Sequence, residues 1–311
     1  MSNSLEELRD KINGAGDLRS VVRTMKSVAA ANIGQYEKSV RSLADYNRTV
    51  ELGLSVCFRK NGAAPILPAR DKKVASRVDA IVFGSDQGLV GQFNDVIVDF
   101  AKKTISGSPS NLKVWAVGER VHARLANTGL PPAGIFSLPH SIKGITPLIG
   151  KILQKGETPL GSDEITELHL FYNRPTSGAS YEPVHQQLLP LDEKWRKKMT
   201  GLKWAGGNLP EMIGDDLTTL RALIREYLFV SLFRACAESL ASENASRLAA
   251  MQRADKNIDE LLKTLNETYH RLRQSGIDEE LFDVISGFEA LKHLACKSGN
   301  RTLFTHLQDL E

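Results

Sequence analysis

A seam of apolar side chains at spacings of three and four residues runs through the C-terminal part of this 311-residue chain. It consists of Leu248, Met251, Asp255, Ile258, Leu262, Leu265, Tyr269 and Leu272, with Asp255 as its one polar member. A stripe with this period becomes buried when a second helix packs on it. The same spacing occurs near the N-terminus, at Ile33, Tyr36, Val40, Leu43, Asn47, Val50 and Leu54. The pattern predicts that the two ends of the chain pair as an antiparallel coiled coil.

The two helical patterns differ in length, so they cannot cover each other completely. The first runs over about 5–58 and the second over about 216–296, roughly 80 Å and 120 Å at the rise of an α-helix. If Leu54 lies opposite Leu220, about twenty residues of the second helix extend beyond the pair. The apolar side chains of this overhang are Ile277, Leu281, Phe282, Val284, Ile285, Phe288, Leu291 and Leu294. Uncovered apolar surface of this kind implies a partner; the alternative is a tip that folds back on the middle of the chain.

Between the two helices, short apolar runs alternate with helical patterns. A linker with two prolines occupies 61–77, and strands over 79–84, 112–118 and 135–136 are each followed by a helix. Further strands over 167–173 and 181–191 are expected to close as a hairpin, and the basic stretch that follows, Lys194, Arg196, Lys197 and Lys198, is interpreted as a solvated loop. The prediction is an α/β fold in which an antiparallel coiled coil of the N- and C-terminal helices carries a central Rossmann-like α/β domain. The expected boundaries are 1–60, 61–214 and 215–311.

Composition excludes several classes of protein. A hydrophobic fraction of 41% with 25% charged residues is ordinary for a folded soluble chain, and a net charge of +3 is too small to indicate nucleic-acid binding. The first residues mix both charge signs without an apolar run, so we expect neither a signal peptide nor a transit peptide. The most apolar window, 223–233, contains Arg225 and Glu226 and is too short to span a bilayer. Three cysteines without CxxC spacing are typical of a reducing compartment and are expected to be buried or free thiols.

The chain contains one segment that could be mistaken for a nucleotide-binding loop. Gly84, Gly88 and Gly91 follow the first predicted strand, but their spacing fits neither GxGxxG nor GxxxxGK[ST]. We expect a structural turn or a protein contact there instead. The sequence has no HExxH or GxSxG motif, and its seven histidines are scattered, each expected to be a surface or packing residue. No catalytic residue, cofactor or metal site is predicted.

Several segments resemble a known family. They are ESLASENASRLAAM over 238–251, RLRQSGIDEEL over 271–281, VISG over 284–287 and MKSVAAA over 25–31. Together they resemble the gamma subunit of F-type ATP synthases, and SDQGLVGQFN over 85–94 is similar to that family's SDRGLCGGFN. Over 112–210 the resemblance rests on the order of elements, so the chain is a divergent member. It departs from the pattern at Gln87, at Val90 and at Gly14-Ala-Gly16, where two glycines, each costing a helix roughly 1 kcal/mol, permit a kink or fraying.

The resemblance implies a non-catalytic central stalk of a rotary ATP synthase, which couples ion-driven rotation to ATP synthesis or hydrolysis. A single copy would turn inside a hexamer of three alpha and three beta subunits, with the α/β domain on the membrane rotor c-ring beside epsilon. Such a subunit is peripheral, at the cytoplasmic face of the bacterial or archaeal plasma membrane. The family's hexamer contacts correspond here to Arg273, Gln274, Arg23, Met25, Lys26, Ile277, Leu281, Ile285 and Phe288. The family's contacts at the foot, the α/β domain that faces the c-ring or epsilon, correspond here to Asp86, Gln87, Gly88, Phe93 and Asn94.

Two other functions remain open at this point. One is a nucleotide-dependent enzyme of Rossmann-like build whose terminal helices form oligomers, and it would show nucleotide affinity or hydrolysis as an isolated chain. The other is a coiled-coil tether with an attached α/β domain, which would pair with a second copy of itself.

Overall fold

The computed structural model describes residues 2–60, 77–105, 112–157, 166–176, 180–191, 193–204, 206, 210–211 and 215–298. The chain forms two compact units, one made of residues 1–24 and 253–311 and the other of residues 25–252. The expected linker at 61–77 lies outside the described residues except for its last position, and the domain boundaries at 60 and 214 stay a prediction.

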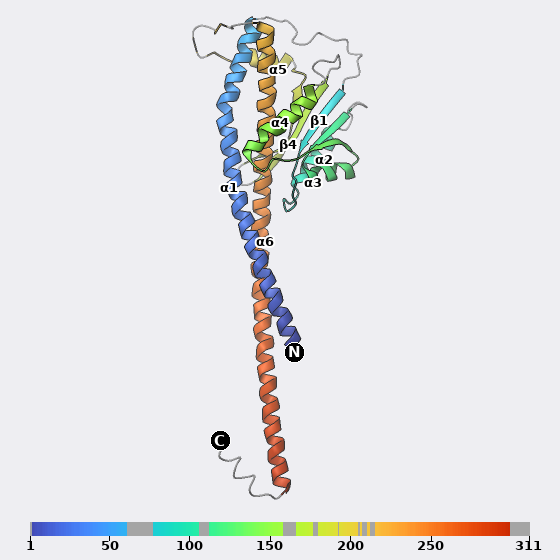
Figure 1. Cartoon of the computed structure of the whole chain (residues 1–311), viewed down its shortest axis with the longest axis vertical. Helices are drawn as coiled ribbons and strands as arrows, with labels where there is room; N and C mark the ends of the chain where they lie inside the picture. The colour runs from blue at the N-terminus through green and yellow to red at the C-terminus, as the bar shows by residue number, and fades with distance from the viewer. Residues whose placement is uncertain are drawn as a thin grey trace. The chain divides into compact units, whose positions relative to one another are not determined.

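Two long helices begin and end close to the predicted positions. The first, α1, spans Ser2–Lys60, and the last, α6, spans Asp216–Ser298. Figure 1 draws α1 in blue and α6 in orange to red, each as an unbroken helix. The helix α1 passes through Gly14-Ala-Gly16 without interruption, and the hydroxyl of Ser20 donates to the carbonyl oxygen of Gly16.

In the unit of residues 25–252, α1 and α6 pair antiparallel. The contacts that set the register are Tyr46 to Glu226 at 2.8 Å and Lys60 to Asp216 at 3.0 Å. The predicted opposition of Leu54 and Leu220 falls between these two pairs, and both leucines are buried in one cluster. Residue numbers fall along α6 as they rise along α1, so the antiparallel prediction is confirmed.

In the unit of residues 1–24 and 253–311, the same two helices pair through charged and small side chains. Arg19 contacts Asp255 at 3.8 Å and Asp259 at 2.5 Å, while Arg23 contacts Asp255 at 3.3 Å. Asp255, the polar seam residue, therefore lies between two arginines of the opposite helix. The N-terminal seam also begins earlier than the prediction, because Ala15 and Val22 are buried at 8% and 6% exposure.

A five-stranded sheet forms the α/β part of the second unit, in the order β3-β2-β1-β4-β5. The strands are β1 (Arg77–Phe83), β2 (Leu112–Val117), β3 (Pro132–Phe136), β4 (Thr166–Pro175) and β5 (Tyr181–Leu189). β1 pairs in parallel with β2 and β4, β2 pairs in parallel with β3, and β4 pairs antiparallel with β5. The three predicted strand–helix units and the closing hairpin are all present.

The sheet is covered on both faces, because side chains of a strand alternate between them. From β1, Ala80 and Val82 pack with α2 (Phe93–Ile105) and α3 (Glu119–Asn127). Ile81 and Phe83 point to the opposite face, where they join α4 (Ile142–Glu157) and the part of α6 that contains Leu228 and Leu232. The domain therefore packs on its own coiled coil through one face of the sheet.

The basic stretch after β5 is a helix and not a solvated loop as predicted. α5 spans Glu193–Thr200, and its side chains Trp195 and Met199 pack on the end of the α1–α6 pair. The Trp195 ring meets the rings of Phe58 and Tyr227 edge to face, with centroids 5.7 Å and 5.1 Å apart. Apolar residues four apart give the segment a buried side, which stabilises the helix despite its short length.

Candidate partner-contact surfaces

The overhanging part of α6 keeps its apolar side chains exposed. Exposed fractions are 54% for Ile277, 57% for Leu281, 68% for Phe282, 70% for Val284, 46% for Ile285, 39% for Phe288 and 60% for Leu291. The side chain of Leu294 lies outside the described residues. Apolar surface of this extent on a soluble helix marks an interaction site.

Arg273 and Gln274 lie directly after Leu272, the last partly buried residue of the α6 seam, and both side chains are exposed. The guanidinium of Arg273 carries a planar set of donors that suits two-point contact with a carboxylate. Both side chains are therefore accessible at the surface of α6.

The three predicted contact residues of α1 differ in their surroundings. Arg23 bonds to Asp255 with its Nε atom, yet 53% of its side chain stays exposed. Met25 and Lys26 are each partly buried. Arg23 thus combines an intrachain ion pair with a side chain that is about half exposed.

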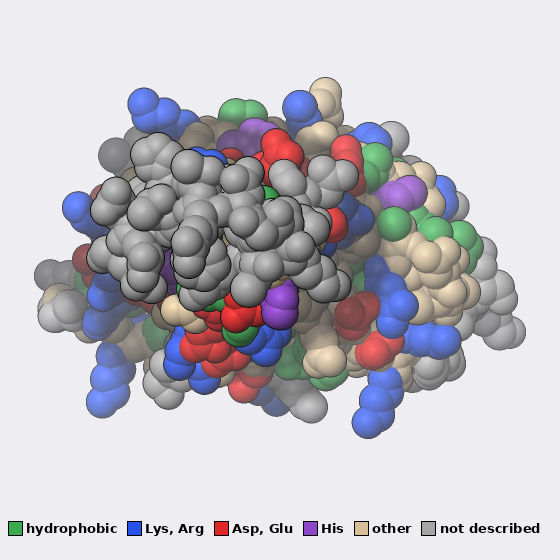
Figure 2. Space-filling model, turned by 90° about the horizontal axis from the view of Figure 1, so that it is seen from below, with side chains coloured by type: hydrophobic (Ala, Val, Ile, Leu, Met, Phe, Trp, Pro, Cys, Tyr) green, Lys and Arg blue, Asp and Glu red, His purple; other side chains and the backbone are tan. Residues whose placement is uncertain are grey.

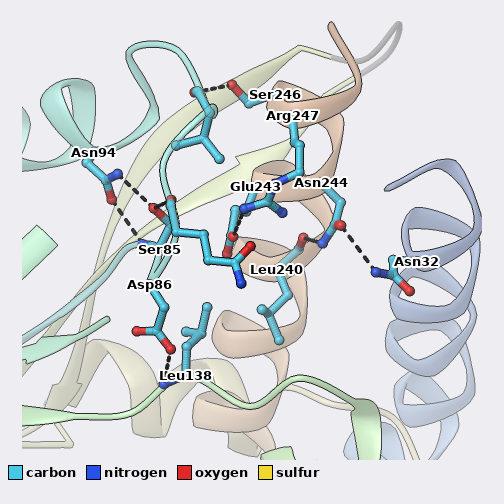
Figure 3. A network of polar contacts seen from close by, with 12 residues as sticks. Asn32, Ser85, Asp86, Asn94, Leu138, Leu240, Glu243, Asn244, Ser246 and Arg247 are labelled. Carbon is cyan, nitrogen blue, oxygen red and sulfur yellow. Dashed lines mark hydrogen bonds and ion pairs between the residues drawn. The ribbon is translucent and has the colours of Figure 1, made fainter. Parts of the chain in front are cut away.

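The turn at 84–94 connects the end of β1 to the start of α2 and is held by its own polar side chains (Figure 3). Asp86 accepts from the backbone N–H of Glu119 at 2.9 Å and from that of Leu138 at 3.1 Å. Asn94 accepts from the backbone N–H of Ser85 at 3.0 Å and donates to the Ser85 hydroxyl at 2.8 Å. These bonds tie the carboxyl end of β1 to the elements that follow β2 and β3.

Only part of this turn is available to a partner. Phe93 is completely buried, and its ring packs edge to face on Tyr181. Gln87 is exposed, and Leu89 is exposed at 62% with a φ of 61°, a conformation that costs a residue other than glycine about 1 kcal/mol. An exposed leucine held in a strained backbone is a signal for contact that the sequence pattern did not reveal.

The turn also bonds to α6, through residues that sequence reasoning did not select. The Ser246 hydroxyl donates to the carbonyl oxygen of Val90 at 2.6 Å. One turn earlier on α6, Glu243 pairs with Arg247 at 2.6 Å, and Asn244 accepts from Asn32 of α1 at 3.4 Å. Figure 3 shows these side chains in the space between α6, the turn and α1. Burial raises the pKa of Glu243 to about 7; Arg247 opposes this rise, and the carboxylate of Asp86 adds to it.

Two of the seven histidines, His169 and His185, pack on each other, which the sequence pattern did not reveal. His169 Nδ1 and His185 Nε2 are 2.9 Å apart on β4 and β5, and burial, followed by the charge of His169, lowers the pKa of His185. Their rings stack at 27°, so their lone pairs do not converge on a common ion. Within the described ranges, no group of three or more His, Cys, Asp or Glu residues could hold a metal ion.

The distribution of surface charge and the hydropathy of the described helices agree with the expectations drawn from the composition. On the face shown in Figure 2, acidic and basic side chains are interspersed, and neither sign forms a continuous field among the coloured atoms. No helix among the described residues is both long enough and apolar enough to traverse a lipid bilayer. Cys57 and Cys236 are buried free thiols, as expected.

Comparison with known proteins decides between the open alternatives. The family model described as ATP synthase matches residues 4–291. The chain belongs to the ATP synthase gamma family. The ATP synthase gamma chain of Nostoc punctiforme is 30% identical, with 93% of this chain and 99% of that protein covered. The gamma chain of Syntrophus aciditrophicus is 28% identical, with 93% and 98% covered.

Solved structures support the same fold. The chain resembles one in the rotor of the Euglena gracilis mitochondrial ATP synthase, with a TM-score of 0.58, 18% identity and coverage of 89% of this chain and 100% of that one. A second structure of that enzyme, with F1 and the c-ring, gives a TM-score of 0.61 at 17% identity, with 94% and 95% covered. A gamma chain is a non-catalytic subunit of the synthase, so neither a nucleotide-dependent enzyme nor a self-pairing tether is favoured.

Proposed function

We propose that this chain is the rotating central shaft of a membrane-bound ATP synthase, present once per complex. It couples ion-driven rotation of a membrane c-ring to ATP synthesis or hydrolysis in a hexamer of three alpha and three beta subunits, with epsilon beside its α/β domain. The complex would lie at the cytoplasmic face of a bacterial or archaeal plasma membrane. The observation that carries the proposal is the exposed apolar stripe on α6 beyond the end of its pairing with α1.

The tip fits an apolar sleeve formed by a ring of larger subunits. Ile277, Leu281 and Ile285 follow one another at intervals of one helical turn and are each about half exposed. A single helix with this stripe can turn within a smooth apolar ring, because dispersion contacts have no preferred direction. Directional hydrogen bonds would instead hold the helix at one angle.

Polar contacts would provide the communication with the catalytic subunits. Arg273 and Gln274 are exposed beyond the last seam residue, where a guanidinium can meet a carboxylate of a beta subunit. Arg23, Met25 and Lys26 would contribute from α1. The shaft is one chain without threefold symmetry, so three beta subunits around it face three different surfaces. Rotation then changes which nucleotide-site conformation is favoured in each of them.

The turn at 84–94 would contact a subunit next to the α/β domain, either the c-ring or epsilon. Gln87 and Leu89 supply the exposed surface, with Gly88 between them. Asp86 and Asn94 fix the conformation of the turn through hydrogen bonds, and the buried side chain of Phe93 stabilises it. We therefore assign direct contact to 87–89 and support to the other three residues.

Native mass spectrometry of the complex isolated from its source organism tests the assignment. We expect one copy of this chain with three copies each of two larger nucleotide-binding subunits. Two or more copies of this chain in a complex without those subunits would favour the tether. Nucleotide hydrolysis by the purified chain alone would favour the enzyme.

A double replacement tests the contact role of Arg273 and Gln274. We expect Arg273→Ala with Gln274→Ala to lower ATP turnover by the complex about tenfold or more, because removal of a charge-assisted contact costs about 1.5–3 kcal/mol. Assembly should be unchanged, since the apolar stripe remains. The matched control is Arg271→Ala, an exposed arginine two residues earlier on the same helix. Equal turnover in the double variant and the wild type would remove the role.

A further inference from the structure

Two glutamates on α6, Glu238 and Glu243, are equally buried, at 4% exposure each, but their charged neighbours differ. Glu238 accepts from Arg234 at 2.7 Å and from Arg174 at 3.3 Å. Glu243 pairs with Arg247 at 2.6 Å through its Oε1 atom. The Oε2 atom of Glu243 and the Nε atom of Arg247 are both buried without a hydrogen-bond partner. The ion pair of Glu243 is therefore incompletely satisfied.

The groups that face Glu243 come from three elements. Arg247 lies on α6, Asp86 lies on the turn, and Tyr36 of α1 and Cys236 of α6 interact with the Glu243 charge. Burial raises the pKa of both Tyr36 and Cys236, so these two groups are neutral around pH 7. When ionised, Glu243 thus meets one positive and one negative neighbour. The carboxylate of Asp86 cannot move away without breaking its bonds to two backbone N–H groups.

Loss of a proton from Glu243 therefore acts on the contact between the turn and α6. The ionised carboxylate repels Asp86 and requires water for its unpaired oxygen, which a buried site supplies only by opening. The turn is joined to α6 by the bond from the Ser246 hydroxyl to the Val90 carbonyl oxygen, and opening of this contact would admit water. Protonation of Glu243 removes the repulsion of Asp86 and lowers the cost of burying the unpaired oxygen, because a neutral carboxyl costs far less to bury than a carboxylate.

We infer that Glu243 is the titrating group of a proton-sensitive latch that holds the turn at 84–94 against α6, closed when Glu243 is neutral and loosened when it ionises. The pKa of Glu243, raised to about 7, places the change near neutral pH. Because the pKa of Glu243 is raised in the closed form, the closed form is favoured at low pH. This preference is lost as the pH rises through the raised pKa. The latch rests on the proposed function in one respect only, that residues 87–89 transmit its opening to a partner subunit.

Hydrogen exchange of the purified full-length chain, expressed as protection factors at about pH 6 and about pH 8, tests the latch. The pKa of Glu243 is near 7 in the closed form and would be near the ordinary value of a glutamate in the open form. The protection factors of the amides of 84–94 should therefore fall roughly tenfold from about pH 6 to about pH 8. In Glu243→Gln, which mimics the neutral acid, the fall should be less than about twofold. Protection of the amides within α4 (Ile142–Glu157) serves as the internal reference.

Two further variants keep the test decisive. Glu238→Gln changes an equally buried glutamate with two arginine partners, and it should retain the tenfold fall. Asp86→Asn removes the opposing charge but keeps an acceptor oxygen, and it should move the midpoint to lower pH. Equal protection of the wild type at both conditions, or a retained fall in Glu243→Gln, would overturn the latch. These outcomes leave the stalk assignment unaffected, because copy number in the native complex tests that separately.

Discussion

Asp255 is a charged residue within an otherwise apolar seam, and the structure gives a reason for its presence. Its carboxylate lies between Arg19 and Arg23 of the opposite helix, and only 14% of its side chain is exposed. A polar seam residue with a specific partner fixes the register of a coiled coil, because a slipped pairing would leave its charge without a partner. In this chain the seam residue and its arginines select one alignment of α1 with α6.

We expect Asp255→Ala to destabilise the isolated chain by about 1–2 kcal/mol, since two arginines lose a shared acceptor in a partly buried place. Thermal unfolding followed by circular dichroism at 222 nm would measure the change. The control is Asp259→Ala, whose side chain is 44% exposed and which pairs with Arg19 at the rim. Its effect should stay below about 0.5 kcal/mol. Equal losses in the two variants would contradict a special role for the seam position.

Elements of the sheet were predictable because their signals are local. Apolar runs bounded by turn residues identified the strands, and the alternation of strand and helix led to parallel pairing of β1, β2 and β3. The heptad spacing at 33–54 and 248–272 likewise identified the pair of helices. In each case the residues that decide the structure lie within one element.

Other features could not be predicted, because their residues are separated in sequence or carry a weak signal. The buried side of α5 consists of Trp195 and Met199. It stabilises the helix only by packing on the end of α1, which is distant in sequence. The start of the N-terminal seam uses Ala15, Val22 and Ala29, and alanine at a seam position is not distinguished from alanine elsewhere in a helix. The bonds of Asp86 and Ser246 link the turn to positions 33, 52 and 156 residues away in sequence.

Two glycines in different elements should respond oppositely to replacement by alanine. A Cβ atom at Gly14, within α1, would have nothing within 4 Å, whereas one at Gly84 would lie 2.3 Å from the Cβ atom of Val121. Gly14→Ala should therefore stabilise the isolated chain by about 0.5–1 kcal/mol through helix propensity. Gly84→Ala should destabilise it by about 1–3 kcal/mol through overpacking between β1 and α3. Urea unfolding compares them, and a loss of stability in Gly14→Ala would indicate that this part of α1 is not helical in solution.

At the scale of the whole molecule, stability and assembly depend on different side chains. Leu54 is fully buried in the pair of helices, whereas Leu281 and Ile285 are exposed at 57% and 46%. A change at the tip removes little intrachain burial, so it should leave the isolated chain stable. The same change removes apolar area that a sleeve of partner subunits would bury.

We expect the double variant Leu281→Glu with Ile285→Glu to unfold within about 0.5 kcal/mol of the wild type, as exposed substitutions generally do. Its incorporation into the complex, measured by co-purification with the two large subunits, should fall strongly. Leu217→Glu is the control, because that leucine is 49% exposed at the opposite end of α6. Its incorporation with the large subunits should be retained. Normal incorporation of the double variant would show that the tip does not depend on apolar contact.

The bare stripe at 277–291 has a consequence for the cell that makes this protein. If other subunits enclose it in the complex, a newly synthesised copy would first display the kind of surface that chaperones bind and proteases recognise. Surplus copies would then be removed, and the amount that persists would follow the supply of the enclosing subunits. The exposed stripe would in this way link the level of this chain to that of its partners.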